Sequence, residues 1–425
     1  MTPGARLAAA IEILDGLEHT AQPADSYLRD WFRARRFAGV KDRAAITERV
    51  YRVLRHRGSL VWRMNAGDGR ALVLASLLAE NESANGIARL FSGEGHAPPV
   101  LSEAELSALA SPPEGEPPTH VRGEYPLWLE PELLRTFGSD LPAEMAAMNA
   151  RASVDLRVNT LRAARDDMLV GLRSLDVAAE RTPFSPVGIR IASSEGLGAL
   201  QHTQFFQTGA FEFQDEASQL VTQLCAVKPG QRVLDLAAGA GGKSLALAAL
   251  MRNRGEILAF DVDARRLKQL PPRARRAGAA IIRIADRRGG PAWGNGKFDV
   301  VLVDAPCSGS GTWRRSPELK WRLTPERLLE LKGLQSWLLD EGARHTKAGG
   351  RLVYVTCSLL ASENEDVCKN FLERSPDFRI VPAARAWSEA GLSMPPPQGV
   401  GEYFRATPYR TATDGFFACI IEQTR

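Results

Sequence analysis

The sequence lacks the features that would mark a secreted, membrane-spanning or metal-binding protein. It has only five cysteines, without a CxxC pair or zinc-ligand spacing, so neither a disulfide framework nor a zinc site is expected. Its six histidines are scattered, and no GxSxG elbow of a serine hydrolase occurs. No apolar run approaches the roughly 18–20 residues of a membrane helix, and the N-terminal stretch carries acids inside its apolar part. We therefore expect a cytoplasmic, monomeric protein that holds no metal and enters no membrane.

The chain also has little net charge, but that charge is unevenly distributed. The net charge is +4, whereas residues 251–290 hold eleven lysines and arginines against four acids. A local excess of this kind is typical of a protein that binds a polyanion such as a nucleic acid. If residues 251–290 are considered alone, a basic helix exposed to solvent explains the excess of positive charge equally well.

Three regions follow from the pattern of apolar residues. Residues 1–130 repeat apolar positions at three- and four-residue steps, which predicts a helical domain with a basic face and a Pro/Gly-rich linker at its end. Residues 150–212 contain a strand pattern (VDLRVNT), a helix pattern (RAARDDMLVGLRSL) and a second strand pattern (GIRIA), which predicts a small α+β module. Residues 213–425 form the third region.

In the third region, short apolar runs rich in β-branched residues alternate with helical segments. The runs RVLDLA, EILAFD, IIRIAD, DVVLVD and RLVYVT are continuous rather than alternating, as expected for parallel strands buried on both faces. This predicts a doubly wound α/β domain, in which ligands bind beyond the carboxyl ends of the strands. Five candidate site residues fall at or just past those ends: Asp235, Asp261, Asp286, Asp304 and Cys357.

A glycine-rich turn, DLAAGAGGKS, follows the first of these strands. It is neither the GxGxxG of dinucleotide-binding proteins nor a P-loop, and a tight turn alone would explain it. Asp261 ends the next strand, nineteen residues after Gly242, where an acid can accept hydrogen bonds from ribose hydroxyls. Asp286 ends the third strand and could accept from an adenine amino group. The pattern predicts a pocket for an adenosine-bearing cofactor.

Two of the five cysteines stand out because each follows a strand into a turn of small or polar residues. These are Cys307 in DAPCSGSG and Cys357 in YVTCSL, whereas Cys225, Cys368 and Cys419 look like small core residues. A thiol in a positive or polar setting can act as a nucleophile. Close by, GTWRRSPELKWR interleaves Arg314, Arg315 and Lys320 with tryptophans, which predicts contacts with phosphates and unpaired bases.

Together these motifs resemble the RsmB/Nop/Sun family of RNA (cytosine-5) methyltransferases. The similar segments are FQDEASQLV, DLAAGAGGKS, DAPCSGSGT, RRSPELKW, YVTCSLLASENED and TDGFFACII, and RARRFAGVKDRAAITERVYRVL resembles a NusB-like helical domain. The resemblance implies a Rossmann-like class I methyltransferase domain, preceded by a small α+β (RRM-like) module and an all-helical NusB-like RNA-binding domain.

The resemblance also implies roles for individual residues. Cys357 would attack C6 of the target cytosine, Cys307 would assist release, and Asp304 would bind the cytosine edge beside the cofactor. S-adenosylmethionine would lie over Ala237, Ala238, Gly239, Ala240, Gly241, Gly242 and Lys243, with Asp261 on its ribose and Asp286 on its adenine.

Several alternatives remain open at this level. Ribosomal RNA of the small subunit is favoured over tRNA because of the NusB-like segment. A non-catalytic RNA-binding or ribosome-assembly factor on the same fold, or a DNA cytosine methyltransferase, would be different outcomes. The double proline at Pro271–Pro272 is expected to shorten the helix that follows Asp263.

Overall fold

The protein folds as two compact units. The computed structural model describes residues 1–35, 37–111, 113–192, 197–285, 297–397 and 400–424. The first unit contains Met1–Ala150 together with Trp313–Leu323, and the second contains Arg151–Thr312 and Thr324–Arg425. The short segment Trp313–Leu323 therefore leaves the second unit and belongs to the first.

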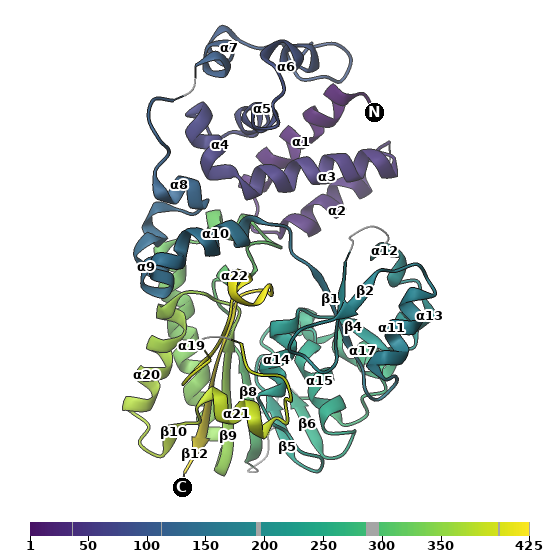
Figure 1. Cartoon of the computed structure of the whole chain (residues 1–425), viewed down its shortest axis with the longest axis vertical. Coiled ribbons are helices and arrows are strands. Elements are labelled where there is room, and N and C mark those ends of the chain that lie inside the picture. Colours follow the sequence, from purple (N-terminus) through teal and green to yellow (C-terminus); the bar gives the residue numbers. More distant parts are fainter. Residues whose placement is uncertain (36, 112, 193–196, 286–296, 398–399, 425) are drawn as a thin grey trace. The chain divides into compact units, whose positions relative to one another are not determined.

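The first unit is helical, as its periodicity predicts (Figure 1). Its α-helices are α1 (Pro3–Glu18), α2 (Ala24–Ala34), α3 (Val40–Arg55), α4 (Arg57–Met64), α5 (Gly69–Ala79), α6 (Ala84–Leu90), α7 (Glu103–Ala110), α8 (Thr119–Gly123), α9 (Glu130–Phe137), α10 (Leu141–Asn149) and α18 (Glu318–Arg322). Ile46, Val50 and Val53, which recur at three- and four-residue steps, are fully buried in its core. Within the expected linker, α7 forms because Ser102 and Glu105 make a capping box.

A four-stranded antiparallel sheet opens the second unit. Its strands are β1 (Val154–Val158), β2 (Ala179–Arg181), β3 (Gly188–Ile191) and β4 (Phe211–Phe213), in the order β2-β3-β1-β4. Helices α11 (Arg165–Arg173), α12 (Leu197–Leu200) and α13 (Gln204–Gln207) accompany it. The prediction found β1, α11 and β3. It missed β2 and β4, which are three residues long and too short to show a period.

The larger sheet has eight strands in the order β10-β12-β9-β8-β5-β6-β7, with β11 paired to β12. The strands are β5 (Arg232–Asp235), β6 (Glu256–Ala259), β7 (Ile282–Ile284), β8 (Phe298–Asp304), β9 (Thr346–Thr356), β10 (Phe378–Ile380), β11 (Phe404–Ala406) and β12 (Phe416–Gln423). The five strands from β5 to β9 pair in parallel, whereas β12 is antiparallel to β9. The doubly wound α/β prediction is confirmed.

Both faces of this sheet are buried. Alternate residues of one strand enter different cores: Val300 and Leu302 pack in one cluster, Val301 and Val303 in the other. Flanking helices are α14 (Glu216–Gln223), α15 (Gly242–Leu250), α16 (Ala264–Leu267), α17 (Leu270–Ala277), α19 (Pro325–His345), α20 (Glu365–Glu373), α21 (Ala383–Glu389) and α22 (Pro408–Thr411). The double proline ends α16 early and lies in the first turn of α17, where proline is tolerated.

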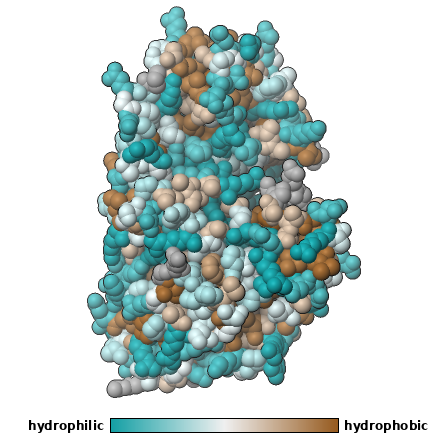
Figure 2. Space-filling model, in the orientation of Figure 1, coloured by the Kyte–Doolittle hydropathy of each residue, from teal (hydrophilic) through white to brown (hydrophobic). Residues whose placement is uncertain are grey.

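The surface of the molecule is mixed in character. On the face drawn in Figure 2, hydrophilic and hydrophobic residues are interspersed. Among the described residues, no helix combines the length and the apolar character that a membrane span requires.

Candidate active site

The carboxyl ends of four adjacent parallel strands bring the candidate residues together. Asp235 ends β5 and pairs in register with Ala259 of β6 and Leu302 of β8. Asp304 ends β8 and pairs with Val355 of β9. Cys357 follows two residues later, just past the end of that strand. The sheet therefore collects the glycine-rich turn, Asp261, Asp304 and both cysteine loops at a single edge, where such folds bind ligands.

The two predicted cysteines are in contact. The Sγ atoms of Cys307 and Cys357 lie 3.4 Å apart, and both residues are partly exposed, whereas Cys225, Cys368 and Cys419 are buried. The hydrogen bond to Cys357 and burial raise the pKa of the Cys307 thiol well above its usual range. Cys307 therefore keeps its proton at neutral pH and can donate it in a hydrogen bond to the sulfur of Cys357.

A lysine from the glycine-rich turn supplies positive charge to this edge. Lys243 Nζ lies 2.6 Å from Asp304 Oδ2. Burial alone would lower the pKa of Lys243, but the Asp304 carboxylate, and to a smaller extent Cys357, raise it above its ordinary value. The ammonium group is therefore charged and supplies positive charge at the edge of the sheet that carries Asp304.

The glycine-rich turn is held open by contacts with the next strand. Asp261 is 4% exposed, and its carboxylate accepts hydrogen bonds from the backbone of Gly239 and of Asp263, both at 2.7 Å. Gly241 has φ +84°, and a Cβ there would lie 2.1 Å from Leu270 Cδ1, so only glycine fits.

The residues around this turn fit a nucleoside cofactor. Asp261 keeps lone pairs for ribose hydroxyls, and the buried Oδ1 of Asp235 has no hydrogen-bond partner among the described residues. Burial raises the pKa of Asp235 to about 7, although Ser244 Oγ donates to its other oxygen at 2.5 Å.

Two arginines donate hydrogen bonds to backbone carbonyls of the glycine-rich turn. Arg157, on β1, donates to Gln214 at 2.5 Å and to the Gly242 carbonyl at 3.4 Å. Arg273, on α17, donates to the Ala240 carbonyl at 2.7 Å and to Glu212 at 2.8 Å. The small α+β module therefore helps to hold the glycine-rich turn, through Arg157 directly and through Glu212, which binds Arg273.

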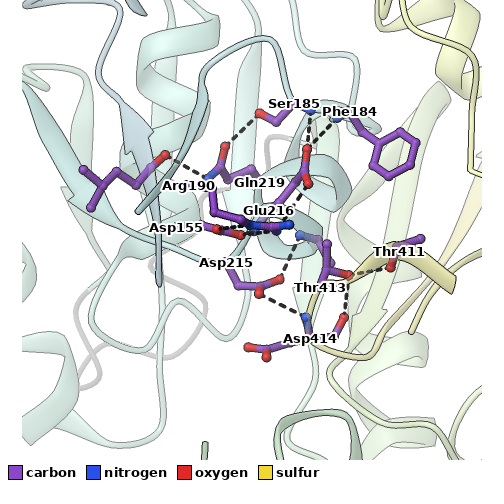
Figure 3. A network of polar contacts seen from close by, with 12 residues as sticks. Asp155, Phe184, Ser185, Arg190, Asp215, Glu216, Gln219, Thr411, Thr413 and Asp414 are labelled. Atoms are coloured by element: carbon purple, nitrogen blue, oxygen red, sulfur yellow. Dashed lines mark hydrogen bonds and ion pairs between the residues drawn. The ribbon is translucent and has the colours of Figure 1, made fainter. Parts of the chain in front are cut away.

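A buried ion pair fixes this module to the start of α14 (Figure 3). Arg190 donates to both oxygens of Asp155, at 2.8 and 2.9 Å, and Asp155 Oδ2 also accepts from the Glu216 backbone. Glu216 in turn accepts from the backbone of Phe184 and Ser185. These contacts tie the FQDEAS segment, at the start of α14, to the small α+β module.

Some predicted residues lie elsewhere. Lys320 is 1% exposed, and its ammonium donates to the Arg55 carbonyl at 3.2 Å and to Asn149 Oδ1 at 2.8 Å. Burial lowers the pKa of Lys320 to about 7. Arg314 is 6% exposed and Arg315 is half-buried, both in the same first unit. This geometry does not support the predicted phosphate contact of Lys320, and Asp286 falls outside the described residues.

Sequence reasoning also missed a buried carboxylate behind the cysteines. Glu363 is fully buried and accepts hydrogen bonds from the serine that follows each cysteine. The repeated Cys-Ser pair, in DAPCSG and TCSLL, was the available signal. Within the described part of the chain, no three His, Cys, Asp or Glu side chains are grouped as metal ligands.

Comparison with known proteins agrees with this geometry. The family model "16S rRNA methyltransferase RsmB/F" matches residues 222–422, and a ferredoxin-like domain of RsmF/B-like methyltransferases matches residues 125–196. The ribosomal RNA small subunit methyltransferase B of Citrobacter koseri is 33% identical over 78% of this chain and 71% of its own length. The chain belongs to the RsmB/F family of 16S rRNA methyltransferases.

Other relatives agree with this assignment. The probable ribosomal RNA small subunit methyltransferase B of Bacillus subtilis is 31% identical over 70% of this chain. That match covers 66% of the relative, so the chain spans just under two thirds of its length. The crystal structure of PH0851 has a TM-score of 0.77 and 28% identity over 100% of this chain and 99% of its own. A methyltransferase homolog from Pyrococcus horikoshii has a TM-score of 0.60 and 30% identity over 72% of this chain and 97% of its own.

Proposed function

We propose that this RsmB/F family member methylates C5 of a cytosine in small-subunit ribosomal RNA through a covalent bond between Cys357 and C6. The observation that carries the proposal is the pair of sulfur atoms 3.4 Å apart at the ligand-binding edge of the sheet, beside a charged lysine and Asp304. A protein that only binds RNA would not require a thiol pair of this kind.

The chemistry follows from the protonation states. Cys357, next to the ammonium group of Lys243, attacks C6 as a thiolate, and the electrons of the C5–C6 double bond move to C5. Asp304 accepts from the cytosine edge and stabilises the ring protonated at N3. The electron pair on C5 then forms the bond to the transferred methyl group. In the second half the C5 proton passes to solvent, its electron pair re-forms the C5–C6 double bond, and Cys357 leaves as a thiolate to which the Cys307 thiol donates a hydrogen bond.

S-adenosylmethionine is the cofactor that fits, and when bound it supplies an electrophilic methyl group. The turn from Ala237 to Lys243 would cradle it, and Asp261 would accept from its ribose hydroxyls. Asp286 remains the candidate for its adenine.

An exposed basic surface beside the cofactor turn is proposed to hold the RNA. Arg265, Arg266 and Lys268 are exposed on or next to α16, and Arg275 is exposed on α17. A terminal nitrogen of Arg266 lies directly against Gly239 of the turn, since a Cβ there would be 2.5 Å from it. These side chains join Arg315 as the proposed phosphate contacts, whereas Arg314 and Lys320 are buried. The NusB-like helical unit would add further RNA affinity to a cytoplasmic, monomeric enzyme.

The deciding experiment offers the protein several nucleic acids. It is incubated with methyl-labelled S-adenosylmethionine and, separately, protein-free 16S rRNA, total tRNA or DNA, and the product nucleosides are identified by mass spectrometry. The proposal expects 5-methylcytosine in 16S rRNA. Label in tRNA or DNA alone would change the substrate class, and no label in any of them would favour a non-catalytic binding factor.

A further inference from the structure

A single buried carboxylate connects the two cysteine-bearing loops. Glu363, in the 3-10 turn Ala361–Glu363, is 0% exposed. One of its oxygens accepts from the Ser308 backbone at 2.9 Å and from Gln335 Nε2 at 2.9 Å. The other accepts from the hydroxyls of Ser308 and Ser358, both at 2.5 Å. The carboxylate therefore accepts hydrogen bonds from the residue immediately after each cysteine, Ser308 and Ser358.

The same serines contact each other, which closes the network behind the sulfur atoms. Ser308 Oγ lies 3.3 Å from Ser358 Oγ, and Ser310 Oγ lies 3.1 Å from each of these hydroxyls. Gly311 also donates to the Cys357 carbonyl at 2.9 Å. The separation of the two loops, and with it the contact between the sulfur atoms, depends on the group at the centre of the network.

The network also places a negative charge behind Cys307. The side chain of Glu363 is the acceptor in all four of its hydrogen bonds, and all four donors are neutral groups. The pKa of Cys307 is raised first by its hydrogen bond to Cys357, then by burial, and further by the charges of Cys357 and Glu363. The carboxylate thus helps to keep the proton on Cys307.

We propose that Glu363 is a positioning residue for methyl transfer, which holds the two cysteine loops at the separation that puts Cys307 Sγ against Cys357 Sγ. This role rests on the proposed covalent function of Cys357. The proposal goes beyond that function by assigning the geometry of the cysteine pair to one fully buried side chain.

Three variants separate position from charge. Glu363→Gln keeps the shape and replaces one acceptor oxygen by a donor, while the serine hydroxyls can rotate to accept. Glu363→Ala removes the connection altogether. Glu365→Gln is the matched control, because it neutralises a carboxylate two residues away that pairs with Arg405 instead of the cysteine loops.

Two readouts are combined with two controls for folding. The first readout is the single-turnover rate of methyl transfer to 16S rRNA. The second is alkylation of each cysteine of the RNA-free protein by iodoacetamide between pH 6 and 9, followed by mass spectrometry. The other three cysteines are at most 1% exposed, so native alkylation reports the pair. S-adenosylmethionine affinity and melting temperature show whether each variant is intact.

The proposal expects Glu363→Gln to fold and to bind S-adenosylmethionine as the wild type does. Its methyl transfer should fall by about tenfold, and that of Glu363→Ala by about a hundredfold, as expected when reacting groups are displaced by about 1 Å. Cys307 in Glu363→Gln should be alkylated at lower pH than in the wild type, and Glu365→Gln should change neither readout. If Glu363→Ala does not fold, Glu363→Gln alone decides.

Two results would overturn it. One is Glu363→Gln with wild-type methyl transfer and a wild-type alkylation profile for Cys307. The other is a loss of transfer matched by equal losses of cofactor binding and thermal stability, which would make Glu363 a residue of the fold only. If the wild type methylates no RNA, the proposed function fails, and the alkylation profiles still decide whether Glu363 governs the thiol pair.

Discussion

At the scale of single residues, environment rather than residue type separates the five cysteines. Burial raises the pKa of Cys225 to about 12, which keeps that thiol neutral and inert. Cys357 instead contacts a second thiol and lies near the charged group of Lys243. The same contrast applies to the acids, because Asp235 is fully buried and bonded to Ser244, whereas Asp304 forms an ion pair with Lys243.

Asp261→Ala should weaken cofactor binding while leaving the fold intact. The variant loses the proposed hydrogen bonds to the ribose and also the anchor of the Gly239 backbone. Loss of bonds to a charged acceptor costs roughly 1.5–3 kcal/mol, which is about ten- to a hundredfold in affinity. Calorimetry with S-adenosylmethionine measures it, with Asp263→Ala as the control on the same turn. An unchanged dissociation constant would remove Asp261 from the site.

Asp235 should make the stability of the protein depend on pH. An ordinary aspartate loses its proton near pH 3.8, whereas Asp235 in the folded protein retains it to about 7. Between these values the native state binds the extra proton, so this contribution to stability is complete below the lower pKa and is lost as pH rises through the upper one. As the pH rises from 5 to 8, the melting temperature of Asp235→Asn should therefore fall less than that of the wild type. Equal slopes for the two proteins would contradict the assignment.

At the scale of elements, what the sequence predicted follows from where apolar residues repeat. The five parallel strands have strong patterns and were predicted correctly, as was their alternation with helical segments. The basic and aromatic segment after Gly311 was interpreted as an RNA contact because composition cannot show what a side chain faces. In the fold Trp321 and Arg322 donate to helix carbonyls of the first unit. Glu363 was missed because two of its partners, Ser308 and Gln335, are distant in sequence.

The basic surface on α16 should control RNA affinity through phosphate contacts. Combined replacement of Arg265, Arg266 and Lys268 by alanine removes three exposed charges. The slope of log K against log salt should then flatten by about two to three units. Filter binding to 16S rRNA across a salt series measures it. Replacing Arg327, Lys332 and Arg344 of α19 is the matched control, and equal slopes for the two triple variants would refute this surface.

At the scale of the whole molecule, the chain is not divided at a single boundary. Residues Trp313–Leu323 are part of the first unit although Thr312 and Thr324 belong to the second. Side chains of this segment bond backbone groups at helix ends: Glu318 accepts from Ala24 at the start of α2, and Arg322 donates to Leu17 near the end of α1. A sequence-based division at one linker could not find this arrangement.

Arg322→Ala should therefore reduce stability without reducing RNA affinity. The variant leaves the carbonyls of Leu17 and Gln22 without their donor, which costs about 1–3 kcal/mol when such groups are buried. Denaturant unfolding measures the loss, and the salt dependence of RNA binding should stay that of the wild type. A flattened salt slope with unchanged stability would restore the segment as an RNA contact.

The most direct test of the account concerns the division of labour between the two cysteines. Cys307→Ala should still attack C6 and transfer the methyl group but release the product slowly, so that protein accumulates on methylated 16S rRNA as a band that survives denaturing electrophoresis. Cys357→Ala, and the double variant, should give neither band nor methyl transfer. A band from Cys357→Ala together with none from Cys307→Ala would make Cys307 the nucleophile and contradict the mechanism.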